Sequence, residues 1–153
     1  MNLTTWRTTS PLLTDLDDES FAFLEDISEE VQYPPDRVIF RVNTPADRFF
    51  MVTEGTVALR MAGPARPPVT IQTVRPGGVL GLSWQMPPHL WQWTAQSIDA
   101  TTLAMFDAET VRQRFETSPE LELALMRVLS SEALKRLQNV RLQLLDVYGD
   151  DRT

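Results

Sequence analysis

The sequence predicts an α+β protein with a short N-terminal helix, an antiparallel β-roll of jelly-roll type, and C-terminal helices. Before residue 33, apolar residues recur at spacings of three and four, as they do on one face of a helix. Residues 38–106 contain short alternating runs separated by turn residues, which is typical of an antiparallel roll or barrel. Helical spacing returns between residues 107 and 148.

The N-terminal helix is expected to follow an irregular lead-in formed by residues 1–14. Asp17 can cap its first turn, and Leu16 with Phe21 would form a hydrophobic staple across the cap. Tyr33-Pro34-Pro35 would stop the helix, because a residue that precedes proline disfavours helical geometry. The apolar face of this helix would consist of Phe21, Leu24, Ile27 and Val31.

Turn signals divide the predicted roll into short strands. Glu54-Gly55 is expected to form a hairpin turn in which Gly55 supplies the positive φ. Arg75-Pro76-Gly77-Gly78 predicts a second turn, and Asp99-Ala100 joins the last two strands. The expected strands cover residues 38–40, 49–53, 56–61, 69–74, 91–98 and 101–106.

Two helices are expected after the roll. Asp107 can cap the first, which would run to about Glu116. Ser118-Pro119-Glu120 indicates a second helix start, because Ser can cap, Pro suits the first helical position and an acid favours the first turn. This last helix would run to Tyr148, with Gly149 as its C-cap. At 1.5 Å per residue it would be about 45 Å long.

A heptad pattern along the last helix predicts a homodimer. Alternating spacings of three and four residues are those of a coiled-coil seam, here with small residues at its middle. The alternative is that the stripe packs on the protein's own roll, but a small roll cannot easily cover so long a helix. We therefore place the dimer seam in the C-terminal half, at Leu137, Val140, Leu144 and Val147. The complete stripe is Leu123, Met126, Ser130, Ala133, Leu137, Val140, Leu144 and Val147.

The length of 153 residues suits one domain with a sizeable core. We divide it into a lead-in (1–14), the roll with its flanking helices (15–117), the long helix (118–148) and a tail (149–153). The chain has no apolar run long enough to span a membrane and no N-terminal leader pattern, so a cytoplasmic location and no membrane contact are expected. The absence of cysteine excludes disulfides and thiolate chemistry.

The formal net charge of −7 gives the chain no general attraction to nucleic acid. The strongest basic cluster is Lys135, Arg136 and Arg141 on the last helix, which Glu132 and Asp146 flank. We interpret this cluster as a solvated helix face. Direct DNA binding is not expected, because the sequence stops at Thr153 with no room for a further reading helix.

Residues 75–95 form the candidate ligand pocket. The segment is rich in glycine and proline, holds three of the four tryptophans, and has no charged side chain between Arg75 and Asp99. It is interpreted as a pocket for an apolar or aromatic ligand, as a surface for an effector protein, or as tryptophans that simply fill a core. The candidate ligand-binding residues are Gly77, Gly78, Gly81, Leu82, Ser83, Trp84, Trp93, Thr94 and Ala95.

Enzyme chemistry has little support in the sequence. His89 is the single histidine, which argues against the several convergent ligands that a metal site needs, so no metal and no cofactor are expected. A haem ligand is the alternative to a plain loop histidine at this position. Ser83 has no recognisable base partner, so a hydrolase is not expected either.

The order of these motifs resembles the cyclic-nucleotide-binding domain of the catabolite activator protein (CRP/FNR-like) superfamily. The segment 33–40 resembles the start of the family's roll, and the hairpin glycine matches Gly55. The segment 74–81 resembles the turn that leads into the phosphate-binding cassette, and Thr94-Ala95 resembles its end. The resemblance covers roughly Leu12 to Tyr148 and implies a regulatory, signalling, non-catalytic domain.

Two departures affect the function that this resemblance implies. The family has a Glu after the glycine that matches Gly81, where it bonds the ribose, but this chain has Leu82. The family also has an Arg before the Thr-Ala pair, where it pairs with the cyclic phosphate, but this chain has Trp93. A buried phosphate without a charged partner is costly, so cyclic AMP and cyclic GMP are expected to bind poorly.

We therefore expect a stand-alone regulatory or sensor module that binds a non-standard or apolar ligand of unknown identity. A degenerate domain that acts only through protein–protein contact or dimerisation is the first alternative. A cyclic AMP- or cyclic GMP-binding regulatory protein is the second.

Overall fold

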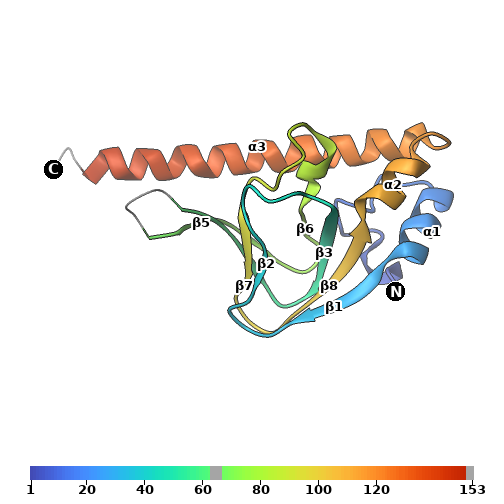
Figure 1. Ribbon diagram of the computed structural model, residues 1–153, viewed down its shortest axis with the longest axis horizontal. Coiled ribbons are helices and arrows are strands. Elements are labelled where there is room, and N and C mark those ends of the chain that lie inside the picture. The colour runs from blue at the N-terminus through green and yellow to red at the C-terminus, as the bar shows by residue number, and fades with distance from the viewer. Residues whose placement is uncertain (63–66, 151–153) are drawn as a thin grey trace.

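The computed structural model describes residues 1–62 and 67–150, and side chains up to residue 146 (Figure 1). A short 3₁₀ turn (Thr4–Trp6) and α1 (Asp18–Ile27) precede the strands, and α2 (Ala108–Arg114) and α3 (Pro119–Asp150) follow them. A second 3₁₀ helix, η2 (Leu82–Gln85), interrupts the strands. The strands are β1 (Glu29–Tyr33), β2 (Val38–Phe40), β3 (Arg48–Glu54), β4 (Val57–Met61), β5 (Val69–Val74), β6 (Val79–Leu80), β7 (Thr94–Ser97) and β8 (Thr101–Asp107).

Two antiparallel four-stranded sheets form a β-roll, which confirms the predicted α+β class. One sheet has the order β1-β8-β3-β6 and the other β2-β7-β4-β5. Inward side chains from both sheets, among them Phe50, Leu59 and Leu103, are fully buried between them. In the part of the chain that the structure describes, no helix is long and apolar enough to cross a bilayer.

The first helix ends earlier than predicted, and the expected continuation of its apolar face to Val31 is wrong. After Ile27, Ser28 has an extended backbone, and its hydroxyl donates to the carbonyl of Glu25 at 2.7 Å. Residues 29–33 then pair with β8, where Val31 lies opposite Leu103. The spacing from Ile27 to Val31 fits a helix, but pairing with a distant strand overrides this local preference.

The predicted hairpin at Gly55 is also wrong. Gly55 does have positive φ, at 82°, but β3 and β4 do not pair with each other and lie in different sheets. The turn is therefore a corner at which the chain crosses from one sheet to the other. Asp99-Ala100 forms a second corner of this kind between β7 and β8, directly beside the first.

The helix starts agree with the sequence. Asp17 caps α1 by accepting a hydrogen bond from Ser20 N at 2.7 Å, and Asp107 caps α2 through Thr110 N at 2.9 Å. At its other end, α3 includes Gly149 instead of ending there. The helix was predicted to end at Tyr148 and is described through Asp150, and a difference of two residues lies within the usual spread of helix boundaries.

The strand expected over residues 91–98 begins only at Thr94. Trp91 pairs instead with the loop between β2 and β3: its N–H donates to Thr44 O at 3.0 Å, and its carbonyl accepts from Asn43 N at 2.8 Å. These bonds keep residues 91–93 out of the β4–β7 ladder. This part of the chain faces α3 instead.

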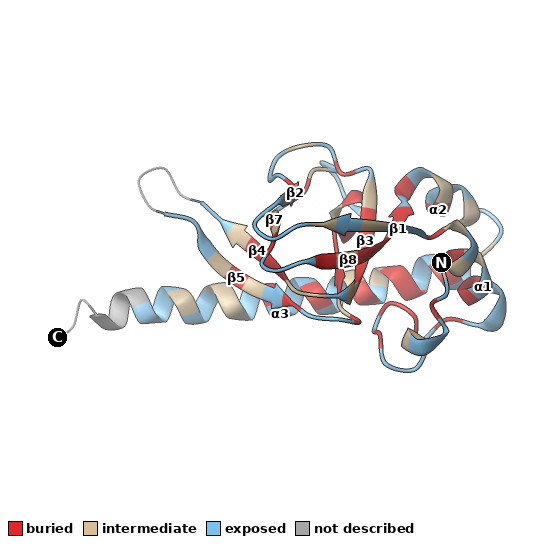
Figure 2. Ribbon diagram, turned by 90° about the horizontal axis from the view of Figure 1, so that it is seen from below, coloured by how far each residue is buried: buried red, intermediate tan, exposed pale blue. Residues whose placement is uncertain are grey.

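The long helix α3 lies along the roll and extends past it, as Figures 1 and 2 show. The roll covers its heptad stripe only in part: Leu123, Leu137 and Leu144 are each more than half exposed, whereas Met126 and Val140 are half-buried. The side chain of Val147 lies outside the described residues. A neighbouring stripe packs against the roll and consists of Leu121, Ala124, Leu125, Val128, Glu132 and Arg136.

Candidate functional site

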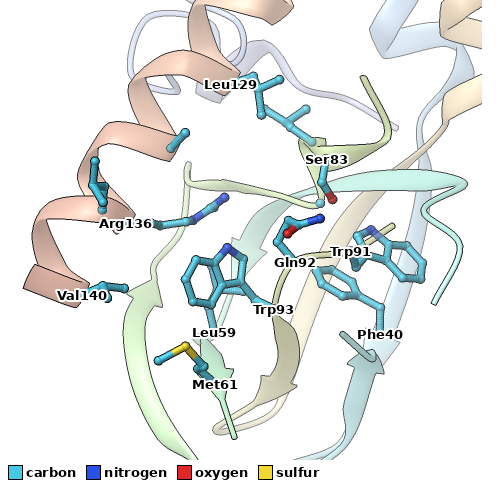
Figure 3. A pocket seen from close by; sticks show the side chains of 14 residues that line it. Phe40, Leu59, Met61, Ser83, Trp91, Gln92, Trp93, Leu129, Arg136 and Val140 are labelled. Atoms are coloured by element: carbon cyan, nitrogen blue, oxygen red, sulfur yellow. The ribbon is translucent and has the colours of Figure 1, made fainter. Parts of the chain in front are cut away.

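A cavity of about 380 Å³ lies between α3 and the roll (Figure 3). Its lining is largely apolar and comes from five stretches of the chain. Strands β2 and β4 form its floor, residues 81–83 and 91–93 form one wall, and α3 forms the other. The lining residues are Phe40, Leu59, Met61, Gly81, Leu82, Ser83, Trp91, Gln92, Trp93, Leu129, Ala133, Arg136, Leu137 and Val140.

Gly81 shapes the wall formed by residues 81–83. Its φ of 88° is in the left-handed region, and a Cβ there would lie 3.3 Å from both Arg48 O and the Cα of Phe49. Only glycine fits this conformation and this close approach to β3 without strain. The turn directs the chain into η2, so that Leu82 and Ser83 line the cavity.

The tryptophans of this segment divide between the cavity and the core. Trp91 and Trp93 line the cavity, and the Trp91 ring stacks on Phe40 at a centroid distance of 4.4 Å. Trp84 is 1 % exposed and stacks on Phe49 and Phe115 in the core. The rings therefore do not fill the cavity.

Four of the nine predicted ligand-binding residues line the cavity: Gly81, Leu82, Ser83 and Trp93. Trp84 lies in the core, and Ala95 is fully buried in β7 opposite Leu59. Thr94 pairs with Arg60, and its hydroxyl accepts from Val42 N at 3.1 Å.

Gly77 and Gly78 lie in the turn before β6 and do not line the cavity. The N–H of Gly77 donates to Val52 O at 2.7 Å, and its carbonyl accepts from the buried hydroxyl of Ser10 at 2.6 Å. The carbonyl of Gly78 accepts from Val52 N at 2.9 Å. Gly77 thus joins the N-terminal segment to the roll, and Gly78 ties the turn to β3.

Arg136 is the main correction to the site that the sequence predicted. The interpretation of Lys135, Arg136 and Arg141 as a solvated face is wrong for Arg136, which is only 8 % exposed and lines the cavity. Its Nε donates to Gln72 Oε1 on β5 at 3.0 Å. Burial lowers the pKa of Arg136, and the nearby carboxylate of Glu132 opposes that shift. The sequence signal for this placement was the spacing of three and four residues that puts Arg136 on one face of α3 with Leu125, Leu129 and Glu132.

His89 lies on the exposed loop between η2 and β7. Its Nδ1 is 2.8 Å from the carbonyl oxygen of Trp84, an interaction that holds the loop against η2. His89 is not among the residues that line the cavity.

The chain belongs to the cyclic nucleotide-binding domain family. The family profile matches residues 30–118, which span the roll and α2. Domains of this family are typically regulatory and non-catalytic. No curated protein matches the chain.

Solved structures with this fold agree with that assignment. A protein from Geobacter metallireducens GS-15, described as a cyclic nucleotide-binding protein, has a TM-score of 0.77 and 26% identity, over 90% of this chain and 98% of that one. The catabolite activator protein of Thermus thermophilus has a TM-score of 0.73 and 20% identity, over 90% and 63%.

A third structure is a mutant regulatory subunit of a cAMP-independent protein kinase A from Trypanosoma brucei, bound to cAMP in its A site. Its TM-score is 0.75 and its identity 16%, over 94% of this chain and 50% of that one. The chain thus spans only part of the length of the last two proteins.

Proposed function

We propose that this domain is a regulatory module whose cavity binds a small ligand other than cyclic AMP or cyclic GMP. One observation carries the proposal: an open apolar cavity adjoins the cassette-like segment, and its walls include Leu82 and Trp93. These residues stand where the family has its ribose-binding Glu and phosphate-binding Arg.

The chemistry of these two positions disfavours a cyclic nucleotide. Leu82 offers no acceptor to a ribose hydroxyl, and an unpaired buried hydroxyl costs about 1–3 kcal/mol. Trp93 offers no charge to the phosphate, which loses a bidentate, charge-assisted partner. Because each 1.4 kcal/mol changes the affinity about tenfold, the two losses together weaken binding by several orders of magnitude.

The cavity itself supports a ligand of a different kind. Its volume of about 380 Å³ is within the range of small-molecule sites, and its aromatic walls suit an apolar body. The Trypanosoma regulatory subunit, a protein of this fold, belongs to a kinase described as cAMP-independent.

Dimerisation through α3 is the second part of the proposal. The exposed Leu137 and Leu144 fall on one heptad stripe with the half-buried Val140. Leu137 and Val140 also line the cavity. A second copy packed on this stripe would cover the cavity mouth, so that ligand and dimer would affect each other's stability.

Calorimetric titration of the full chain with cyclic AMP and cyclic GMP tests the ligand proposal. We expect no heat of binding at micromolar concentrations, whereas micromolar affinity for either nucleotide would overturn the proposal. Native mass spectrometry of the protein as purified is the complementary measurement. A co-purifying small molecule would support a sensor.

A domain that acts only through protein contacts is the alternative, and the exposed leucines of α3 favour it. The two functions differ at the cavity. Widening it by Trp93→Ala would alter the response to a ligand in a sensor. In a pure interaction module the same change would leave partner binding unaffected.

A further inference from the structure

Arg136 brings a charge into the apolar cavity. It is the one charged side chain among the lining residues that the structure describes, and it comes from α3 instead of the cassette-like segment. Figure 3 shows its guanidinium extending from the helix toward Ser83 and Trp93. The cavity therefore has one cationic group set among aromatic and aliphatic walls.

The guanidinium of Arg136 has few partners. Its side chain is 9 % exposed, and within the described residues Nε is its one nitrogen with a hydrogen bond, to Gln72. Nη2 is buried without a hydrogen-bond partner and lies 3.7 Å from Glu132 Oε2, beyond hydrogen-bonding distance. Buried charged donors are normally satisfied, so this arrangement lacks an acceptor.

The charges around Arg136 indicate what charge the missing acceptor should carry. Glu132 faces two cations, Arg136 at 3.7 Å and Lys135 Nζ at 3.4 Å. Lys135 is more than half exposed, so the buried groups are one guanidinium and one carboxylate, which do not hydrogen-bond to each other. A single negative charge on a ligand would pair with the unpartnered Nη2 of Arg136, while Lys135 offsets the charge of Glu132 from the solvent side. A dianion would leave an excess of negative charge in a poorly solvated site.

We propose that the cavity binds a small apolar monocarboxylate whose carboxylate pairs with Arg136. The planar guanidinium suits a carboxylate, because it can donate two parallel hydrogen bonds. The rings of Trp91 and Trp93, with Leu129 beyond, contact the apolar body of the ligand. This inference rests on the proposed function, since it names the class of ligand that the same cavity takes.

Two probes of similar shape test the charge requirement. We would titrate the full chain with phenylbutyrate and with its neutral amide, phenylbutyramide, by calorimetry and by tryptophan fluorescence. The wild type is expected to bind the acid at least tenfold more tightly than the amide. In Arg136→Met, which keeps the length and loses the charge, the two affinities should become equal.

A second variant changes the affinity in the opposite direction and so separates binding from folding defects. Glu132→Gln removes the carboxylate that competes for Arg136, and we expect it to strengthen acid binding several-fold with little effect on the amide. A damaged fold would not give tighter binding.

Three results would overturn the inference: equal affinity for acid and amide in the wild type, an acid preference that survives Arg136→Met, or no binding of either probe at millimolar concentration. None of these would show that a cyclic nucleotide binds. Only the separate nucleotide titration can overturn the proposed function, so the two failures are distinguishable.

Discussion

The carboxylate of Asp99 accepts a hydrogen bond of 2.8 Å from the backbone N–H of Thr56. This bond joins the two corners at which the chain crosses between the sheets, one between β3 and β4 and the other between β7 and β8. The hydroxyl of Thr101 donates to Thr56 O at 3.2 Å and reinforces the link. The two corners thus hold the crossings between the sheets side by side.

Gly55→Ala is expected to lower the free energy of unfolding by about 2–5 kcal/mol. A left-handed backbone costs an alanine roughly 1–2 kcal/mol. The new Cβ would also lie 2.4 Å from Ala100 O, and overpacking of this kind adds about 1–3 kcal/mol. Urea unfolding monitored by fluorescence measures the change.

Gly77→Ala is the matched control for this corner. Gly77 also has positive φ, at 91°, but a Cβ there would meet only the ring of Trp6, at an ordinary distance of 3.5 Å. It should cost only the backbone strain, about 1–2 kcal/mol. If both variants lose equal stability, the steric role of the corner is refuted.

Asp99 should make the stability of the roll depend on pH. Its pKa is held below the ordinary 3.8, mainly by the hydrogen bond from Thr56 N. Because the pKa of Asp99 is lower in the folded than in the unfolded protein, its charge stabilises the fold above pH 3.8. This stabilisation is lost as the pH falls through the folded-state pKa.

The isosteric variant Asp99→Asn isolates this contribution. Wild type should be more stable than the variant at pH 7, and the gap between their urea midpoints should close as pH falls below 4. A gap that remains constant down to pH 2.5 would mean that the carboxylate charge is unimportant at the corner.

Local signals in the sequence identified the helix caps but not the pairing of the strands. Asp17 and Asp107 cap their helices through bonds to residues only three positions away, so short-range chemistry was enough. The positive φ of Gly55 was equally local. Whether that turn forms a hairpin or a corner depends on β8 and β7, which are distant in the chain and leave no mark on the turn itself.

The candidate site was predictable to the extent that it lies on one segment. The family resemblance assigns Gly81, Leu82 and Trp93 to the ligand site, and all three line the cavity. Arg136 was missed because its burial depends on Gln72 of β5, which lies 64 positions away. A cluster of basic residues on a helix looks solvated until the covering strand is known.

Trp84 and Trp93 should respond differently to truncation. Trp84 is packed between Phe49 and Phe115, so Trp84→Ala is expected to cost about 3–5 kcal/mol of stability. Trp93 lines the cavity, and its loss enlarges a space that already exists. Trp93→Ala should therefore cost much less, and chemical denaturation of the two variants in parallel measures the difference. Equal losses would place Trp93 in the core.

The heptad stripe of α3 gives the last prediction, that Leu144→Asp converts a dimer to a monomer. Leu144 is 52% exposed on the stripe, and a buried aspartate in a helix seam would leave a desolvated charge on each copy. Leu137→Asp should have the same effect.

Leu142→Asp is the matched control, because Leu142 is 60% exposed but lies on the opposite side of the heptad. Sedimentation velocity should therefore give a dimer for the wild type and for Leu142→Asp, and a monomer for Leu144→Asp. A wild-type monomer at high concentration would rule out the seam, and dissociation by both variants would move the interface to another face of α3.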